Sequence, residues 1–192
     1  QAVQLLGIDS PTGFTAKAAD WVEEAFASLG FSAMRTNKGG VLIDLGGAGD
    51  MQALLLQAHT DTLGAMVAEI KENGRLRLTP LGGLRAENAE TENLRVYTRT
   101  GAVIEGTLQL VNASVHVNGD YAETKRGFDT TEAVLDKDVQ SASAVRALGI
   151  EVGDIVCFDP RTRITGSGYI KSRFLDDKLS VGILLGFARW LR

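Results

Sequence analysis

The sequence predicts an α/β fold in which a β-rich segment interrupts a helix-covered mixed sheet. Apolar residues recur at helical spacing near both ends of the chain, in residues 15–30 and 177–191. The continuous apolar run Ala53–Ala58 is typical of a strand buried on both faces. Residues 66–164 instead carry strand and turn patterns with one short helical pattern. We therefore expect one domain from residues 1–65 and 165–192, and an inserted domain from residues 66–164.

The two helical segments differ in how they end. Thr15 can cap the first helix, and Gly30 can end it in a left-handed conformation. The second helix is apolar on all sides, which is typical of a helix in the middle of a larger structure. No glycine, asparagine or proline stop signal follows it before Arg192. We therefore expect this chain to be the N-terminal part of a longer protein.

Strands and tight turns are predicted between the helices. Asn73-Gly74 is a strong hairpin signal because both residues tolerate the positive φ of tight turns. It lies between the predicted strands Met66–Lys71 and Arg75–Thr79. A short helix is expected from Ser141 to Gly149. The other predicted strands are Val41–Leu45, Leu94–Thr98, Val103–Asn112, Ser114–Val117 (with a structural His116) and Ile155–Phe158.

Composition limits the classes of partner. Hydrophobic residues make up 44% and charged residues 23% of the 192 residues, an ordinary mixture for a globular protein. A net charge of −4 gives no reason to expect a nucleic-acid partner, because phosphate binding favours a basic face. The apolar stretches are too short to span a bilayer, and no signal peptide is visible, so no membrane partner is expected. Cys157 has no second cysteine to pair with, which favours a reducing cytoplasm.

The first group of candidate functional residues follows the apolar run at 53–58. His59 stands where open α/β sheets bind their ligands, at the carboxyl end of the predicted strand. Asp61 can accept a hydrogen bond from one ring nitrogen and so orient the other nitrogen toward a metal. A structural histidine that happens to precede an aspartate fits the same pattern.

The second group is the pair Asp176-Asp177 at the start of the last helix. Two adjacent carboxylates are costly to bury without a partner, and a divalent cation removes that cost. The alternative is a helix cap, because aspartates at a helix start satisfy free amides and suit the dipole. Asp177 can be the cap while Asp176 is the ligand.

The order of these motifs along the chain resembles that of the tetrahedral aminopeptidases. These co-catalytic metal peptidases include the deblocking and glutamyl aminopeptidases. The resemblance covers essentially the whole chain, with departures at Thr60 and Thr62, where the family has methionine and glutamate, and in residues 129–140. The matching motifs are Ser10-Pro11-Thr12-Gly13, Gly39-Gly40, His59-Thr60-Asp61 with Gly64, Gly82-Gly83, Gly153-Asp154 and Leu175-Asp176-Asp177-Lys178.

The resemblance implies a role for each part of the chain. His59 would bind one of two divalent metal ions, Asp176 would bridge both, and Asp61 would orient His59. Zinc is the first choice of metal, and cobalt or manganese are alternatives. The Asp176-Asp177 peptide bond would be cis. The insert would be a β-barrel through which identical subunits associate, and the substrate would be a peptide cleaved at its N-terminus.

The resemblance also implies that the chain lacks part of the active site. The family's general-base glutamate, a neighbouring glutamate, a later acidic ligand and a final histidine would lie beyond Arg192. We therefore expect the chain alone to be inactive. Two rivals remain: a related metal-dependent deacylase or carboxypeptidase, and a non-catalytic assembly module of the same fold. The insert lies between His59 and Asp176, which favours the aminopeptidase over the deacylase.

Overall fold

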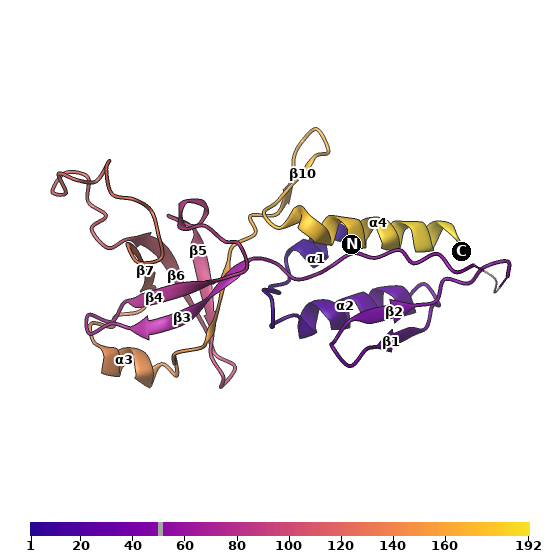
Figure 1. The fold of residues 1–192 in the computed structure, drawn as a ribbon, viewed down its shortest axis with the longest axis horizontal. Coiled ribbons are helices and arrows are strands. Elements are labelled where there is room, and N and C mark those ends of the chain that lie inside the picture. Colours follow the sequence, from indigo (N-terminus) through magenta and orange to yellow (C-terminus); the bar gives the residue numbers. More distant parts are fainter. Residues whose placement is uncertain (50–51) are drawn as a thin grey trace. The chain divides into compact units, whose positions relative to one another are not determined.

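The computed structural model describes residues 1–49 and 52–192, which form two compact units. Unit 1 consists of residues 1–62 and 160–192, and unit 2 of residues 63–159 (Figure 1). The junctions lie a few residues before the expected positions 66 and 164. The first strand of unit 2 already begins at Gly64, and the strand that contains Ile164 pairs within unit 1.

Unit 1 is built from three helices and two short hairpins within the described residues. The second helix follows Thr15 as expected, although the Thr15 side chain makes no capping hydrogen bond. The hairpins pair β1 with β2 and β9 with β10, both antiparallel. The elements are α1 (Ala2–Leu6), α2 (Ala16–Ala27), β1 (Ala33–Arg35), β2 (Val41–Ile43), β9 (Arg163–Ile164), β10 (Ile170–Lys171) and α4 (Leu175–Trp190).

The core of unit 1 lies where its three helices pack together. Leu5 of α1, Phe26 of α2 and Leu185 of α4 belong to one buried cluster. Gly182 lets α1 approach α4 closely, since a Cβ atom there would lie 2.9 Å from the Cβ of Ala2. Burial of these side chains is the main term that holds the helices together. The other buried members of the cluster are Ala18, Val22, Phe31, Val181 and Ala188.

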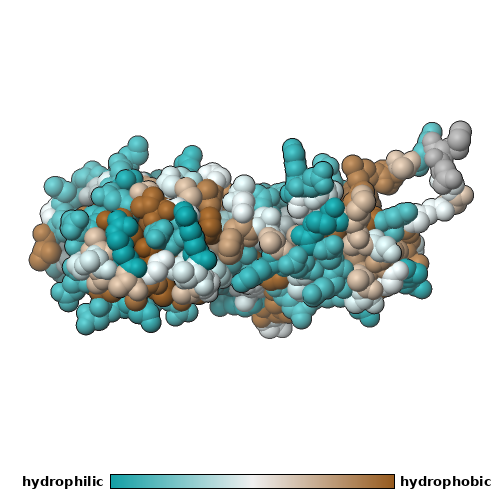
Figure 2. Space-filling view, turned by 90° about the horizontal axis from the view of Figure 1, so that it is seen from below, coloured by the Kyte–Doolittle hydropathy of each residue, from teal (hydrophilic) through white to brown (hydrophobic). Residues whose placement is uncertain are grey.

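The predicted strand Ala53–Ala58 is wrong for this structure. Residues 52–61 have no strand assignment, and no strand among the described residues pairs with them. Leu54, Leu55 and Leu56 are 83%, 69% and 45% exposed. Figure 2 shows patches of hydrophobic surface, in brown, among the polar surface of this face of the protein. The apolar run provides side chains for a strand but not the neighbouring strands that a sheet requires.

Unit 2 is a closed barrel of six antiparallel strands in the order β3-β4-β7-β6-β5-β8 (Figure 1). The α/β class with an inserted barrel is thereby confirmed. Strand β7 was not predicted, because its sequence Thr-Glu-Ala-Val-Leu is short and carries no clear alternation. The elements are β3 (Gly64–Ile70), β4 (Leu76–Leu81), the 3₁₀ helix η1 (Ala86–Asn88), β5 (Asn93–Tyr97), β6 (Val103–Leu110), β7 (Thr131–Leu135), α3 (Ala142–Ala147) and β8 (Ile155–Phe158).

Strand β6 of the barrel buries alternate residues. In β6, Ile104, Leu108 and Leu110 are buried, as expected for a period of two residues. The hairpin predicted at Asn73-Gly74 joins β3 to β4, and Gly74 has φ +80°. A side chain at Gly74 would also collide with the Val139 carbonyl oxygen, 2.7 Å from the Cβ position. Glycine is therefore required at position 74 for two reasons, the positive φ and the lack of space for a Cβ atom.

One charged cluster is buried in the barrel. The carboxylate of Glu132 is 1% exposed and accepts hydrogen bonds from Lys71 Nζ at 2.6 Å and from Arg75 Nη1. Both cationic side chains are only partly buried, so their charges keep contact with solvent. The pairing satisfies a carboxylate that would otherwise be costly to bury.

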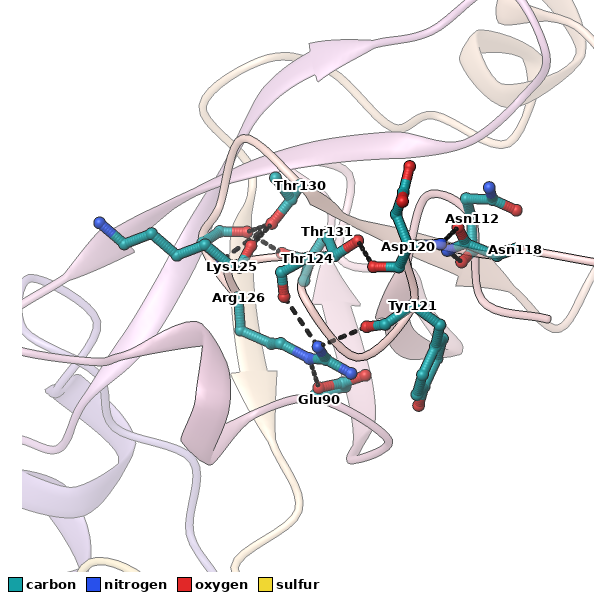
Figure 3. Close-up of polar contacts among 11 residues, drawn as sticks. Glu90, Asn112, Asn118, Asp120, Tyr121, Thr124, Lys125, Arg126, Thr130 and Thr131 are labelled. Atoms are coloured by element: carbon teal, nitrogen blue, oxygen red, sulfur yellow. Dashed lines mark hydrogen bonds and ion pairs between the residues drawn. The ribbon is translucent and has the colours of Figure 1, made fainter. Parts of the chain in front are cut away.

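The segment 111–130 of unit 2 is a loop, so the strand predicted at Ser114–Val117 is wrong and His116 is exposed on a turn. Arg126 braces this loop from within: its guanidinium pairs with Glu90 and donates to the carbonyl oxygens of Tyr121 and Thr124 (Figure 3). The guanidinium also lies over the Tyr121 ring, 4.8 Å from its centroid. These side-chain contacts order the loop without a strand ladder.

No helix in the described part of the chain combines the length and the apolar character needed to cross a membrane.

Candidate metal site

Two of the predicted site residues lie together in unit 1 despite the long sequence between them. His59 Nε2 lies 3.1 Å from Asp176 Oδ1, across 117 positions of sequence. His59 stands at the end of the extended segment 52–58, and Asp176 stands in the first turn of α4. The close approach predicted for these two side chains is confirmed. Their role as metal ligands stays a prediction.

Asp61 lies on the opposite side of the imidazole ring. His59 Nδ1 is 3.1 Å from the Asp61 main-chain oxygen and 3.1 Å from Asp61 Oδ1. A proton on Nδ1 is therefore held by acceptors, which leaves the lone pair of neutral imidazole on Nε2, the nitrogen that faces Asp176. This is the arrangement by which a neighbouring carboxylate orients a metal-binding histidine.

The electrostatics of the site favour positive charge between His59 and Asp176. Both ring nitrogens face oxygen acceptors, but a neutral imidazole can donate from only one of them. Burial, the largest single influence, lowers the pKa of His59. The Asp61 carbonyl and the carboxylates of Asp61 and Asp176 together outweigh it, so the pKa is raised. Without a metal, a second proton on the ring satisfies both acceptors.

The same geometry fits a metal ion at Nε2. Two ligands of one tetrahedral zinc with bonds of about 2.0–2.2 Å lie about 3.3–3.6 Å apart. The observed 3.1 Å between Nε2 and Asp176 Oδ1 is slightly shorter. The side chains of His59 and Asp176 are 52% and 93% exposed, so an ion could reach both. A cation would replace the second proton as the positive charge between them.

The start of α4 has an unusual backbone at the paired aspartates. The Asp176-Asp177 peptide bond is cis, as the resemblance implies. Both aspartates have non-helical φ/ψ angles, and Phe174 just before them has φ +60°. The regular turns of the helix follow Asp177. The backbone therefore presents Asp176 outside the helical ladder, toward His59.

The site is only partial in the described residues. Within residues 1–49 and 52–192, no three His, Cys, Asp or Glu side chains are placed to hold one metal ion. Asp61 faces Nδ1, the ring nitrogen that points away from Asp176. A catalytic zinc takes three protein ligands. His116, the other histidine, lies in unit 2 and is exposed on its loop.

Three further residues near the site had no role assigned from the sequence. Thr12 donates a hydrogen bond to Asp61 Oδ2, Ser10 donates to the Thr60 carbonyl oxygen, and Lys178 donates to the Ile8 carbonyl oxygen. Ser10 and Thr12 belong to the motif Ser-Pro-Thr-Gly, and Lys178 follows the two aspartates. The motifs mark these positions, but only the structure shows what the side chains contact.

Comparisons with known proteins connect this geometry to one family. The family model for M42 glutamyl aminopeptidases matches residues 39–192. The protein YhfE of Bacillus subtilis is 42% identical over 95% of this chain and 53% of its own length. The chain thus spans about half the length of the curated relatives it matches.

Solved structures give the same assignment of fold. An aminopeptidase from the archaeon Desulfurococcus kamchatkensis matches 98% of this chain and 50% of its own, with 25% identity and a TM-score of 0.86. The TET1 peptidase of Pyrococcus horikoshii, which can assemble into a tetrahedron or a large octahedral shell, matches 98% of this chain and 56% of its own. Its identity to this chain is 19% and its TM-score is 0.80.

Proposed function

We infer the function of this chain from one premise: it belongs to the M42 glutamyl aminopeptidase family. We propose that its full-length form is a metal-dependent aminopeptidase that hydrolyses N-terminal residues from peptides. The chain spans about half of its relatives, so it supplies one part of the active site. The observation that carries the proposal is the approach of His59 Nε2 to Asp176 Oδ1 at 3.1 Å.

In this proposal His59, through Nε2, and Asp176, through its carboxylate, would hold the divalent metal ions. Asp61 holds the proton on Nδ1 and fixes the ring. When bound, the two divalent ions supply a water of lowered pKa and polarise the peptide carbonyl. Imidazole and carboxylate suit zinc first, with cobalt or manganese as alternatives. A glutamate from the other half of the protein would serve as the general base of the reaction.

We also propose that identical subunits associate through the barrel of unit 2. The support is the assembly of the TET1 peptidase, whose fold this chain shares. The cellular compartment we propose is the cytoplasm, because the sequence has one cysteine, Cys157, and so cannot form an internal disulfide. Light scattering coupled to size-exclusion chromatography tests the association. A full-length protein that is monomeric at micromolar concentration would contradict it.

The test of function compares the 192-residue chain with the full reading frame that encodes it. Both are loaded with zinc or cobalt and assayed on leucyl and glutamyl anilides. Turnover is expected from the longer protein alone, since proton transfer by a general base contributes about 10²–10⁴-fold to rate. In the longer protein, His59→Ala should abolish turnover.

His116→Ala is the matched control, because it removes the other histidine from an exposed turn of unit 2. It should leave turnover and metal content unchanged. Comparable turnover by the short and long proteins would show that the missing half is dispensable. Full activity of His59→Ala would remove the assigned metal site.

A further inference from the structure

The segment Ile8–Thr12, which lies between α1 and α2, is hydrogen-bonded to residues 60–62, just after His59. Ser10 Oγ donates to the Thr60 carbonyl oxygen at 2.7 Å, and the Thr62 amide donates to the Ser10 carbonyl oxygen at 2.8 Å. The Thr12 amide donates to the Thr62 carbonyl oxygen at 3.3 Å. Ser10 is completely buried, so the two bonds that Ser10 itself makes are shielded from water.

The hydroxyl of Thr12 contacts Asp61, the residue whose carboxylate faces His59. Thr12 Oγ1 donates to Asp61 Oδ2 at 2.8 Å, while Asp61 Oδ1 lies 3.1 Å from His59 Nδ1. The two oxygens of the carboxylate are thus divided between Thr12 and His59. Rotation of the carboxylate would break both contacts at once, so Thr12 holds Asp61 in the orientation that fixes the imidazole.

The same segment also holds the start of α4. Lys178, two residues after Asp176, is 1% exposed and donates from Nζ to the Ile8 carbonyl oxygen. Just before Ile8, α1 packs on α4 at the close approach of Ala2 to Gly182. Ile8–Thr12 therefore contacts both residues 60–62, which follow His59, and Lys178 of α4, the helix that contains Asp176.

We propose that Ile8–Thr12, the N-terminal brace, sets the distance between His59 and Asp176, with Thr12 as a positioning residue for His59 through Asp61. The extended segment 52–61 cannot do this itself, because no strand in the described part of the chain pairs with it. The consequence for metal binding rests on the proposed function, whereas the consequence for the geometry of the metal-free protein does not.

The experiment compares Thr12→Val, which removes the hydroxyl, with Thr12→Ser, which keeps it. Thr36→Val is the matched control, since Thr36 is an exposed threonine of unit 1 whose Oγ1 accepts a hydrogen bond from the Gly40 amide. Two quantities are measured in the 192-residue chain. The first is the NOE between the His59 ring and the first turn of α4 in metal-free buffer. The second is zinc affinity by calorimetry.

We expect Thr12→Val to weaken the NOE and to lower zinc affinity by about 10–100-fold, the usual effect of losing a residue that orients a metal ligand. Thr12→Ser and Thr36→Val should keep both quantities, and all three variants should keep the melting temperature. Ser10→Ala should speed hydrogen exchange at the Thr62 amide; its control is Ser28→Ala, since Ser28 is exposed and its Oγ also donates to a carbonyl oxygen, that of Ala25.

The two readouts separate the inference from the proposed function. If Thr12→Val keeps the NOE and Thr12→Ser behaves no differently, the brace is overturned. If the NOE depends on Thr12 but the unsubstituted chain binds no zinc, the brace stands and the proposed metal site of this chain fails. If both quantities fall together and serine restores them, both proposals are supported.

Discussion

The two units of this chain differ in how completely they cover their own apolar residues. In unit 2 the barrel closes, so its strands pair with one another and its inward side chains are buried. In unit 1 the three leucines at 54–56 are exposed although consecutive side chains of an extended segment point to opposite sides. Ile183 and Trp190 of α4 are 62% and 78% exposed as well. In a closed sheet every strand finds hydrogen-bonding partners within the sheet, and the inward side chains are covered. A single extended segment has neither.

This difference matters for function because the candidate metal site belongs to the less covered unit. His59 continues directly from the exposed leucines, and Asp176 stands at the start of the helix with the exposed aromatic residue. Large exposed apolar patches mark surfaces that bind other polypeptide. The site and the uncovered surface are thus parts of the same unit.

The largest expected difference in the free energy of unfolding is between alanine substitutions of one leucine from each unit. Leu108 of β6 is fully buried, so Leu108→Ala should lower the free energy of unfolding of unit 2 by about 2–5 kcal/mol. Leu54→Ala should change the free energy of unfolding by no more than about 0.5 kcal/mol, because its side chain is already in solvent. Urea denaturation followed by far-UV circular dichroism measures both. Equal costs would mean that Leu54 is covered in solution.

A smaller effect is expected from the buried charge of the barrel. Glu132→Gln keeps the shape but removes the charge that Lys71 and Arg75 share, and should lower the free energy of unfolding by about 1–3 kcal/mol. Glu69→Gln is the control, because the Glu69–Arg77 pair is about half exposed and such pairs contribute about 0–1 kcal/mol. The comparison uses the same denaturation assay. A cost for Glu69→Gln as large as that for Glu132→Gln would argue against burial as the cause.

The smallest effect is a pH dependence of unit 1. The pKa of His59 is raised above its ordinary value of 6.5, so its protonated form is the one stabilised by folding. This contribution is fully present below about pH 6.5 and is lost as pH rises through the raised pKa. In metal-free buffer, the stability difference between the unsubstituted chain and His59→Gln should therefore shrink on going from acidic to alkaline pH. His116→Gln controls for loss of a histidine, and a difference that stays constant with pH would contradict the assignment.

Much of the barrel could be predicted because its information is local. The hairpin at Asn73-Gly74 needs only a residue pair that tolerates positive φ, and β8 coincides with the predicted strand Ile155–Phe158. Strand β7 escaped prediction since it is five residues long and its buried Glu132 breaks the apolar pattern. His116 was placed in a strand because Val-His-Val alternates, although contacts of Arg126 order that loop instead.

The sequence by itself determined the candidate residues His59, Asp61 and Asp176, because a histidine after an apolar run and paired carboxylates at a helix start are local patterns. Only the tertiary structure decided that Nε2 faces Asp176, since this contact joins two residues that are 117 positions apart. It also decided the hydrogen bonds that Ser10, Thr12 and Lys178 make to the carbonyl oxygen of Thr60, to Asp61 Oδ2 and to the carbonyl oxygen of Ile8. Residues 53–58 show in another way what sequence alone leaves undecided, because their strand-like pattern does not form a strand. Side-chain pattern can favour a strand, but a strand exists only where another backbone offers its hydrogen bonds.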